Sequence, residues 1–183
     1  MKDKEYIIIH GLGGSPQGHW QDFLYKELQN QGKKVLFPQF PNNSEPFLED
    51  WICELHGLKE HIHENTVVIA HSMGVILWLH YISKYIDTRI NKAILVAPPS
   101  KEFLVSHNFA KSFADFNLDK ENFHRINLHS LLIASTNDEY CLPSAWEKFG
   151  RILDLDYLEL APEAGHINMA SGYGKWQDFL KHL

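Results

Sequence analysis

Short runs of branched apolar residues recur along the chain, and between them lie longer segments with the period of an amphipathic helix. The runs, each interpreted as a strand buried on both faces, are Tyr6–Ile9, Lys34–Phe37, Thr66–Ala70, Lys92–Ala97, Ser130–Ala134 and Asp156–Leu160. The helical segments are His19–Gln31, Pro46–Ile62, Met73–Ile86, Pro143–Leu153 and Tyr173–Leu183. Strands that alternate with helices predict an α/β fold with a parallel sheet of about six strands and right-handed crossovers.

The segment Pro46–Ile62 shows the helical period most clearly, because its apolar residues are spaced three or four apart. Pro46 and Pro143 each stand at the start of a helical segment. A first-turn position suits proline, since the N–H that proline lacks would have no partner there. We therefore expect helices to begin at both prolines.

Length and composition limit the architecture and the partners. A chain of 183 residues with 44% hydrophobic and 22% charged residues suits one globular domain, so we expect a single domain over residues 1–183. The formal net charge of -6 offers no basic surface to a polyanion, and we expect no nucleic-acid partner. The apolar run Tyr6–Ile9 is too short for a signal peptide or a membrane span, so we expect a cytoplasmic protein without membrane association.

The cysteines and histidines give no strong indication of a disulfide or a metal site. Cys53 and Cys141 lie far apart in a chain that is large enough to fold without a disulfide, so we expect two free thiols. His56, His61 and His63 lie near the end of a helical segment, where a metal cluster and a solvated face are both open interpretations and the solvated face is favoured. We expect no metal site.

One connection is much longer than a usual link between strand and helix. The segment from Pro98 to His129 carries phenylalanines among polar residues, at positions Phe103, Phe109, Phe113, Phe116 and Phe123. We expect it to form helices over the carboxyl edge of the sheet. Two interpretations stay open, an ordinary crossover helix with its apolar face packed down and a small cap over residues 98–129 that covers the substrate.

The run Ala70-His71-Ser72-Met73-Gly74 has the form of a nucleophile elbow, because an apolar strand leads into it and a helix begins directly behind it. Such a turn exposes the serine Oγ in a strained conformation and needs small residues two places before and after it. Gly74 meets this need, and Ala70 stands where the usual pattern has glycine. A tight strand-to-helix turn without chemistry is the alternative.

Two later residues complete a triad in the chain order serine, acid, histidine, each following the end of a strand. Asp138 follows Ser130–Ala134, and His166 follows Asp156–Leu160. His166 would take the proton of Ser72, and Asp138 would orient the imidazole and stabilise its cation. The neighbouring Glu139 is the rival acid, and Asp138 is favoured.

The glycine-rich run after the first strand does not fit a phosphate site. A dinucleotide fingerprint needs G-x-G-x-x-G followed by an acid at the end of the second strand, whereas Pro16 interrupts the glycines and the second strand ends in Phe37-Pro38. In a hydrolase this loop supplies a backbone N–H to the oxyanion hole. We expect the N–H groups of Leu12 and Met73 to form that hole.

Four groups of residues together resemble one family. They are His10-Gly11-x-Gly13-Gly14-Ser15-Pro16 with His19-Trp20 behind it, His71-Ser72-Met73-Gly74, Asn137-Asp138, and Gly165-His166-Ile167-Asn168. In these the chain resembles, over nearly its whole length, the small single-domain α/β-hydrolases of the retinoblastoma-binding protein nine type. The resemblance implies a three-layer α/β-hydrolase fold with strand order 2-1-3-4-5-6, a Ser72, Asp138 and His166 triad, and no metal or cofactor.

The family name suggests a protein partner bound through a Leu-x-Cys-x-Glu motif. Trp51 stands two places before Cys53, and Glu139 stands two places before Cys141, so the motif is absent. The retinoblastoma protein is therefore not carried over as a partner, and no other protein partner is predicted.

These observations lead to one main hypothesis, a serine hydrolase that cleaves a small carboxylic ester or an amide through an acyl-enzyme on Ser72. A catalytically weak protein-binding module on the same scaffold is an alternative, since a fold alone never establishes activity. An acyltransferase or a perhydrolase that uses the same triad is another.

Overall fold

The computed structural model describes residues 3–85, 89–115, 127–141, 145, 155 and 157–183. Six strands form one parallel sheet in the order β2-β1-β3-β4-β5-β6, which confirms the expected fold class and strand order. The strands are β1 Glu5–Ile9, β2 Lys34–Leu36, β3 Thr66–His71, β4 Ile90–Val96, β5 Asn127–Ser135 and β6 Tyr157–Ala161. The α-helices are α1 Trp20–Asn30, α2 Leu48–Gly57, α3 Met73–Lys84 and α4 Lys101–Ser106. Short 3-10 helices are η1 Lys59–His61, η2 Asn108–Phe113, η3 Met169–Ser171 and η4 Gln177–His182.

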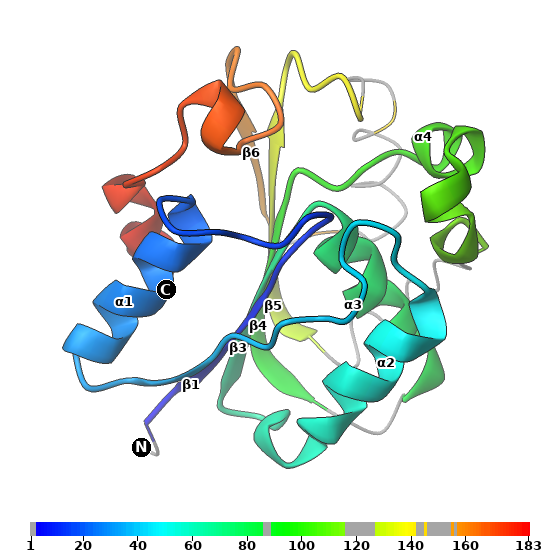
Figure 1. The fold of residues 1–183 in the computed structure, drawn as a ribbon. Coiled ribbons are helices and arrows are strands. Elements are labelled where there is room, and N and C mark those ends of the chain that lie inside the picture. The colour runs from blue at the N-terminus through cyan, green and yellow to red at the C-terminus, as the bar shows by residue number, and fades with distance from the viewer. Residues whose placement is uncertain (1–2, 86–88, 116–126, 142–144, 146–154, 156) are drawn as a thin grey trace.

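The sheet is the middle of three layers (Figure 1). Helix α1 and the C-terminal η4 cover one face, while α2 and α3 cover the other. The apolar strand residues divide between the two faces by simple alternation. Ile7, Val68 and Leu95 pack toward α2 and α3, whereas Ile8, Ile69 and Ile94 pack toward α1. Burial on both faces explains the unbroken apolar runs of β1 and β3. The edge strand β2 was also expected to be buried, but it is exposed at Lys34 and only half-buried at Val35 and Leu36, because no strand pairs with its outer edge.

The second predicted helix is shorter than its sequence pattern. Its expected range was Pro46–Ile62, but α2 begins after the N-cap Phe47 and ends at Gly57. Pro46 therefore lies before the cap and not in the first turn, which corrects that expectation. The helix ends where glycine, a poor helix former, meets a residue outside helical geometry, since Leu58 has ψ 11°. The pattern continues through Ile62 only because Ile62, which directly follows the 3-10 turn, is buried in the core.

The C-terminal segment is not the α-helix that was expected over Tyr173–Leu183. It forms only the 3-10 turns of Gln177–His182. Gly172 is left-handed at φ 88°, and the backbone between it and Trp176 turns through further short-range hydrogen bonds, so little chain is left for a helix. The predicted helix Pro143–Leu153 lies almost wholly outside the described residues.

The long connection after β4 packs against the body of the protein in its described part. Leu104 in α4 is fully buried, as are Ala110 and Phe113 in η2, and all three belong to the core on the α3 side of the sheet. Residues 116–126 lie outside the described part, and residues 127–129 belong to β5, which begins before its predicted start at Ser130. The apolar face of α4 and η2 is thus packed down, and a substrate-covering role for the segment stays a prediction.

In the ranges that the structure describes, the helices are all too short or too polar to cross a membrane.

Candidate active site

Ser72 is the single residue between a strand and a helix. Strand β3 ends at His71 and α3 begins at Met73, so the chain reverses at Ser72 with φ 55° and ψ -125°. Residues with a side chain rarely adopt a positive φ, and such strain collects at functional sites. A hydrogen bond of 2.9 Å from the Ser72 N–H to the carbonyl oxygen of Val96 ties the turn to the neighbouring strand. The backbone of Ser72 therefore has the geometry of a nucleophile elbow.

Two glycines allow this turn to lie against the loop after β1. A Cβ built on Gly74 would meet the carbonyl oxygens of Ile9 and His10 at 2.6 Å. A Cβ built on Gly11 would meet the Cβ of Ser72 at 2.8 Å. Real Cβ atoms do not approach other atoms so closely, so these positions require glycine for close packing.

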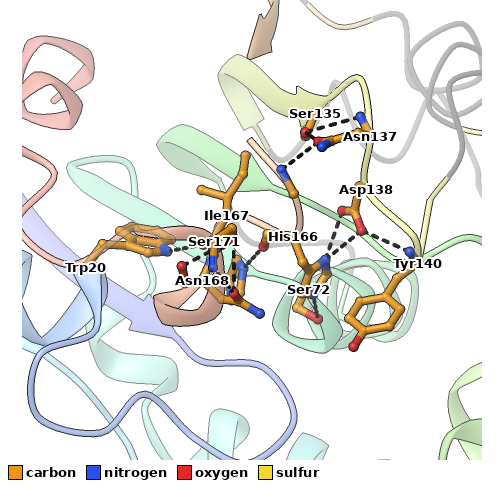
Figure 2. A network of polar contacts seen from close by, with 12 residues as sticks. Trp20, Ser72, Ser135, Asn137, Asp138, Tyr140, His166, Ile167, Asn168 and Ser171 are labelled. Carbon is orange, nitrogen blue, oxygen red and sulfur yellow. Dashed lines mark hydrogen bonds and ion pairs between the residues drawn. The ribbon is translucent and has the colours of Figure 1, made fainter. Parts of the chain in front are cut away.

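His166 connects the serine to an acid, as Figure 2 shows. Its Nε2 lies 2.8 Å from the Oγ of Ser72, and its Nδ1 lies 2.8 Å from Oδ2 and 3.0 Å from Oδ1 of Asp138. Since a carboxylate only accepts, Nδ1 carries the proton and Nε2 is free to accept one from the serine hydroxyl. The structure thus brings the three predicted residues together in one hydrogen-bonded chain, whose members are between 1% and 8% exposed.

The two candidate acids differ in burial. Asp138 is 1% exposed and accepts a second hydrogen bond, 2.9 Å long, from the N–H of Tyr140. Glu139 points outward as an exposed residue. The ring of Tyr140 then packs edge-on against the imidazole of His166, with ring centroids 4.4 Å apart. The preference for Asp138 over Glu139 therefore agrees with the geometry.

The loop after β5 and the loop after β6 are hydrogen-bonded to each other (Figure 2). The side-chain oxygen of Asn137 accepts from the N–H of Gly165 at 2.7 Å and from the Ser135 hydroxyl at 2.9 Å. The hydroxyl oxygen of Thr136 accepts from the N–H of Glu163 at 2.9 Å. These bonds fix the distance between the segment that carries Asp138 and the segment that carries the base.

His10 holds the peptide group between Gly11 and Leu12 in the loop after β1. Its Nδ1 donates to the carbonyl oxygen of Gly11 at 2.7 Å, while its Nε2 accepts from the N–H of Phe40 at 3.0 Å. The N–H of Gly14 also donates to the Gly11 oxygen, at 3.2 Å. In a trans peptide the C=O and the next N–H point in opposite directions, so the Leu12 N–H is directed away from these partners. Within the described ranges it has no hydrogen-bond partner.

The same loop is anchored at its far end by a buried amide. Gln21 in α1 donates to the carbonyl oxygen of Ile9 at 3.0 Å and accepts from the hydroxyl of Ser15 at 2.6 Å. Gln21 is fully buried, and both of its polar ends are satisfied. On the opposite side of Ser72, the N–H of Met73 is the first of α3, where no intrahelical partner exists.

Two further buried histidines lie near the base, His71 beside His166 and His19 beside His71. The His71 ring centroid is 5.1 Å from that of His166 and 5.3 Å from that of His19. Burial lowers the pKa of His19 to about 4, and burial lowers the pKa of His71 well below its ordinary range. The positive charge of a protonated His166 is the second cause of both lowered pKa values. Sequence reasoning assigned no role to either residue.

The remaining histidines of interest lie far from this chain of contacts. His61 and His63 face the carboxylate of Glu5, at 3.2 and 3.4 Å. His56 stacks on Tyr85 with ring centroids 4.1 Å apart. The part of the chain that the structure describes contains no cluster of three or more metal-binding side chains.

Comparison with known proteins identifies the family and the fold. The family model for serine hydrolases matches residues 6–183. The chain belongs to the serine hydrolase family. YdeN of Bacillus subtilis, a candidate hydrolase of this kind, is 30% identical over 137 residues, which cover 74% of this chain and 72% of YdeN.

Solved structures of similar proteins share the fold over almost the full length. The crystal structure of the ydeN gene product from B. subtilis superposes with a TM-score of 0.85 at 26% identity, covering 98% of this chain and 97% of that one. A YdeN-like protein from Pectobacterium atrosepticum superposes with a TM-score of 0.79 at 21% identity, covering 99% and 89%. The α/β hydrolase MGS-MChE2, from a lagoon-sediment metagenome, gives 0.71 at 18% identity, covering 99% and 90%. This serine hydrolase therefore has the α/β-hydrolase fold.

Proposed function

We propose that this serine hydrolase cleaves a small carboxylic ester or amide through an acyl-enzyme on Ser72. The observation that carries the proposal is the 2.8 Å contact between His166 Nε2 and Ser72 Oγ, with Asp138 bound to the other ring nitrogen. A serine hydroxyl is a weak nucleophile at neutral pH, and a base at hydrogen-bond distance is what activates it.

In the first half-reaction the Ser72 Oγ attacks the carbonyl carbon while its proton passes to His166 Nε2. The carbonyl oxygen becomes an oxyanion. When this intermediate collapses, the bond to the leaving group breaks, and the leaving group takes the proton from His166. The product that departs is an alcohol or an amine, and the acyl group stays on Ser72.

In the second half-reaction a water molecule takes the place of the leaving group. His166 accepts a proton from the water as its oxygen attacks the acyl carbon. Collapse of the second oxyanion releases the carboxylic acid, and Ser72 Oγ regains its proton from His166. Asp138 keeps the imidazole in the required tautomer and stabilises its cation throughout.

The backbone N–H groups of Leu12 and Met73 bind the oxyanion in this proposal. The carbonyl oxygen of Gly11 already accepts from His10 and Gly14, which leaves the Leu12 N–H available. The Met73 N–H lies at the positive end of α3, next to the serine. Donors fixed before the reaction stabilise developing charge without reorganising, which is often the largest single contribution to catalysis.

Within the family, we assign the chain to the retinoblastoma-binding protein nine type. The support is the set of motifs that run from His10 through Asn168, together with the size of a single domain. The assignment carries no protein partner, since neither cysteine lies in a Leu-x-Cys-x-Glu context.

Labelling with a fluorophosphonate tests the proposal directly. The probe should modify Ser72, as located by peptide mass spectrometry, and should fail on the Ser72→Ala and His166→Ala variants. Ser106→Ala, at an exposed serine on α4, is the matched control and should label like the natural protein. On p-nitrophenyl esters, Ser72→Ala should lose about 10⁴- to 10⁶-fold in kcat.

Two results would contradict the proposal. A folded protein whose Ser72 does not react with the probe would favour the protein-binding module on a hydrolase scaffold. Transfer of the acyl group to added alcohol or peroxide in preference to water, measured by product analysis, would favour the acyltransferase or the perhydrolase.

A further inference from the structure

The loop that carries His166 holds an unusual backbone conformation. Three of its residues have positive φ, namely Glu163 at 51°, Gly165 at 56° and Ile167 at 49°. Glycine adopts this region freely, but a β-branched residue there is a true outlier. Ile167 directly follows His166, so the strained residue is next to the base of the proposed reaction. Some contact must hold Ile167 in this state.

Two buried side chains bind consecutive carbonyl groups at this point. The indole Nε1–H of Trp20 donates to the carbonyl oxygen of Ile167 at 2.9 Å, as Figure 2 shows. His71 Nε2 donates to the carbonyl oxygen of His166 at 3.0 Å. Trp20 is 1% exposed and His71 is 4% exposed, so neither bond has to compete with bulk water.

We propose that Trp20 and His71 are positioning residues of the hydrolase reaction, acting on His166 through the main chain. The two carbonyls belong to the peptide groups on either side of Ile167. Fixing both groups sets φ and ψ of Ile167, and fixing the first also sets the direction in which the Cα–Cβ bond of His166 leaves the chain. The inference rests on the proposed function, because it assigns these contacts a role in aiming His166 at Ser72.

The anchors of both donors are rigid. His71 is the last residue of β3 and directly precedes Ser72, so its bond joins the backbone of the nucleophile to the backbone of the base. Trp20 is the first residue of α1 and packs among Trp176 and Phe179, with ring centroids 5.5 and 4.9 Å away. The low pKa that burial gives His71 also keeps this ring neutral beside His166.

Packing and hydrogen bonding can be separated by substitution. Trp20→Phe removes the indole N–H and keeps an aromatic ring in the core. Trp176→Phe is the matched control, because it makes the same change in the same aromatic cluster and loses no hydrogen bond to the loop. At the second position, His71→Gln keeps a donor at about the reach of Nε2, whereas His71→Met has similar length and no donor.

The test measures the hydrolysis of p-nitrophenyl acetate and the labelling of Ser72 by a fluorophosphonate. Trp20→Phe and His71→Met should lower kcat and the labelling rate about 10- to 100-fold with little change in KM, because a displaced base impairs the chemical step. His71→Gln should recover most of the rate, and Trp176→Phe should lose little. Equal losses in Trp20→Phe and Trp176→Phe, or in His71→Gln and His71→Met, would show that packing alone matters and would overturn the inference.

A crystal structure of Trp20→Phe tests the positioning role without any substrate. We expect Ile167 to leave the positive-φ region and the contact between His166 Nε2 and Ser72 Oγ to lengthen beyond hydrogen-bond distance. Retention of both features would overturn the inference even if the rate falls. If the natural protein does not react with the probe, the proposed function is contradicted. The structural comparison would still show whether the hydrogen bonds from Trp20 and His71 position the loop that carries His166.

Discussion

Gly74, the second residue of α3, lies so close to β1 that a Cβ on it would be 2.6 Å from the carbonyl oxygen of Ile9. The backbone oxygen cannot move aside, because Ile9 is held in the sheet beside Ala70. Helix α3 can therefore begin directly behind Ser72 only if the residue at this position has no side chain.

Gly74→Ala should lower the free energy of unfolding by about 1 to 3 kcal/mol or more, since the added methyl group forces the helix away from the sheet. Chemical denaturation measures the loss, and fluorophosphonate labelling of Ser72 should slow because the elbow shifts with the helix. Gly57→Ala is the control at an exposed helix end where a Cβ would meet nothing within 4 Å. It should be neutral or stabilising by about 0.5 to 1 kcal/mol. Equal effects at both positions would contradict the packing argument.

Asp138→Asn should lower kcat on p-nitrophenyl esters by about 10⁴-fold with a small change in KM, because an amide can donate to His166 Nδ1 and then stabilises the wrong tautomer. Glu139→Gln makes the same chemical change one residue further on, at an exposed side chain, and should leave the rate nearly unchanged. Steady-state kinetics on the two purified variants measure the difference. A larger loss in Glu139→Gln would reverse the assignment of the acid.

His19 should make the folded protein less stable in mild acid. Its pKa is lowered from 6.5 to about 4, chiefly by burial. Between these two values the unfolded chain binds a proton at His19 that the folded chain does not bind. The contribution of His19 to the free energy of unfolding is therefore fully present above pH 6.5. It is lost as the pH falls toward about 4, by up to about 3 kcal/mol.

The variant His19→Asn isolates this contribution. His19 Nδ1 accepts from the N–H of Gln21 at 3.2 Å as the N-cap of α1, and asparagine is among the best N-cap residues. Urea unfolding at several pH values from 7.5 to 4 should give a flatter curve for His19→Asn than for the natural protein. Two parallel curves would mean that the proton uptake of other groups dominates.

The two cysteines should differ strongly in reactivity. Cys53 is exposed on α2, whereas Cys141 is buried, and burial together with the charge of Asp138 raises the pKa of the Cys141 thiol to about 12. A thiol-specific reagent should therefore titrate one thiol quickly in the native protein and a second one only after denaturation. Cys53→Ser should abolish the fast reaction. Fast reaction in that variant would show that Cys141 is accessible.

The sheet could be predicted from the sequence, and the three residues of the proposed triad could be selected from it, because each leaves a local signal. A strand that is buried on both faces must be apolar throughout, and this property identified β3 and β4. Because Ser72 directly follows β3, it also identified the edge of the sheet where Ser72 lies. Asp138 and His166 were found by chain order, since parallel strands deliver their following loops to one edge. The sequence favoured Asp138 over Glu139, but it could not show that Asp138 is buried and that Glu139 is exposed.

The backbone conformations and the supporting contacts could not be predicted, because they arise from residues distant in the chain. The hydrogen bond from Trp20 to Ile167 joins residues 147 positions apart, and no sequence pattern near either residue indicates it. The positive φ of Ile167 contradicts its local preference and exists only because the folded protein holds it. The C-terminal segment failed as an α-helix prediction for a related reason, since its apolar residues have helical spacing but pack around Trp20 from turns and a 3-10 helix.

The proposed site draws its parts from Leu12, Ser72, Asp138 and His166, so it spans most of the length of the polypeptide. Each of these residues follows a different strand. The strand that precedes the base is β6, which lies at one edge of the sheet. A partly folded chain that lacks this edge would contain the nucleophile but leave it inert. Reactivity of Ser72 toward an electrophile would then report the step of refolding at which β6 joins the sheet.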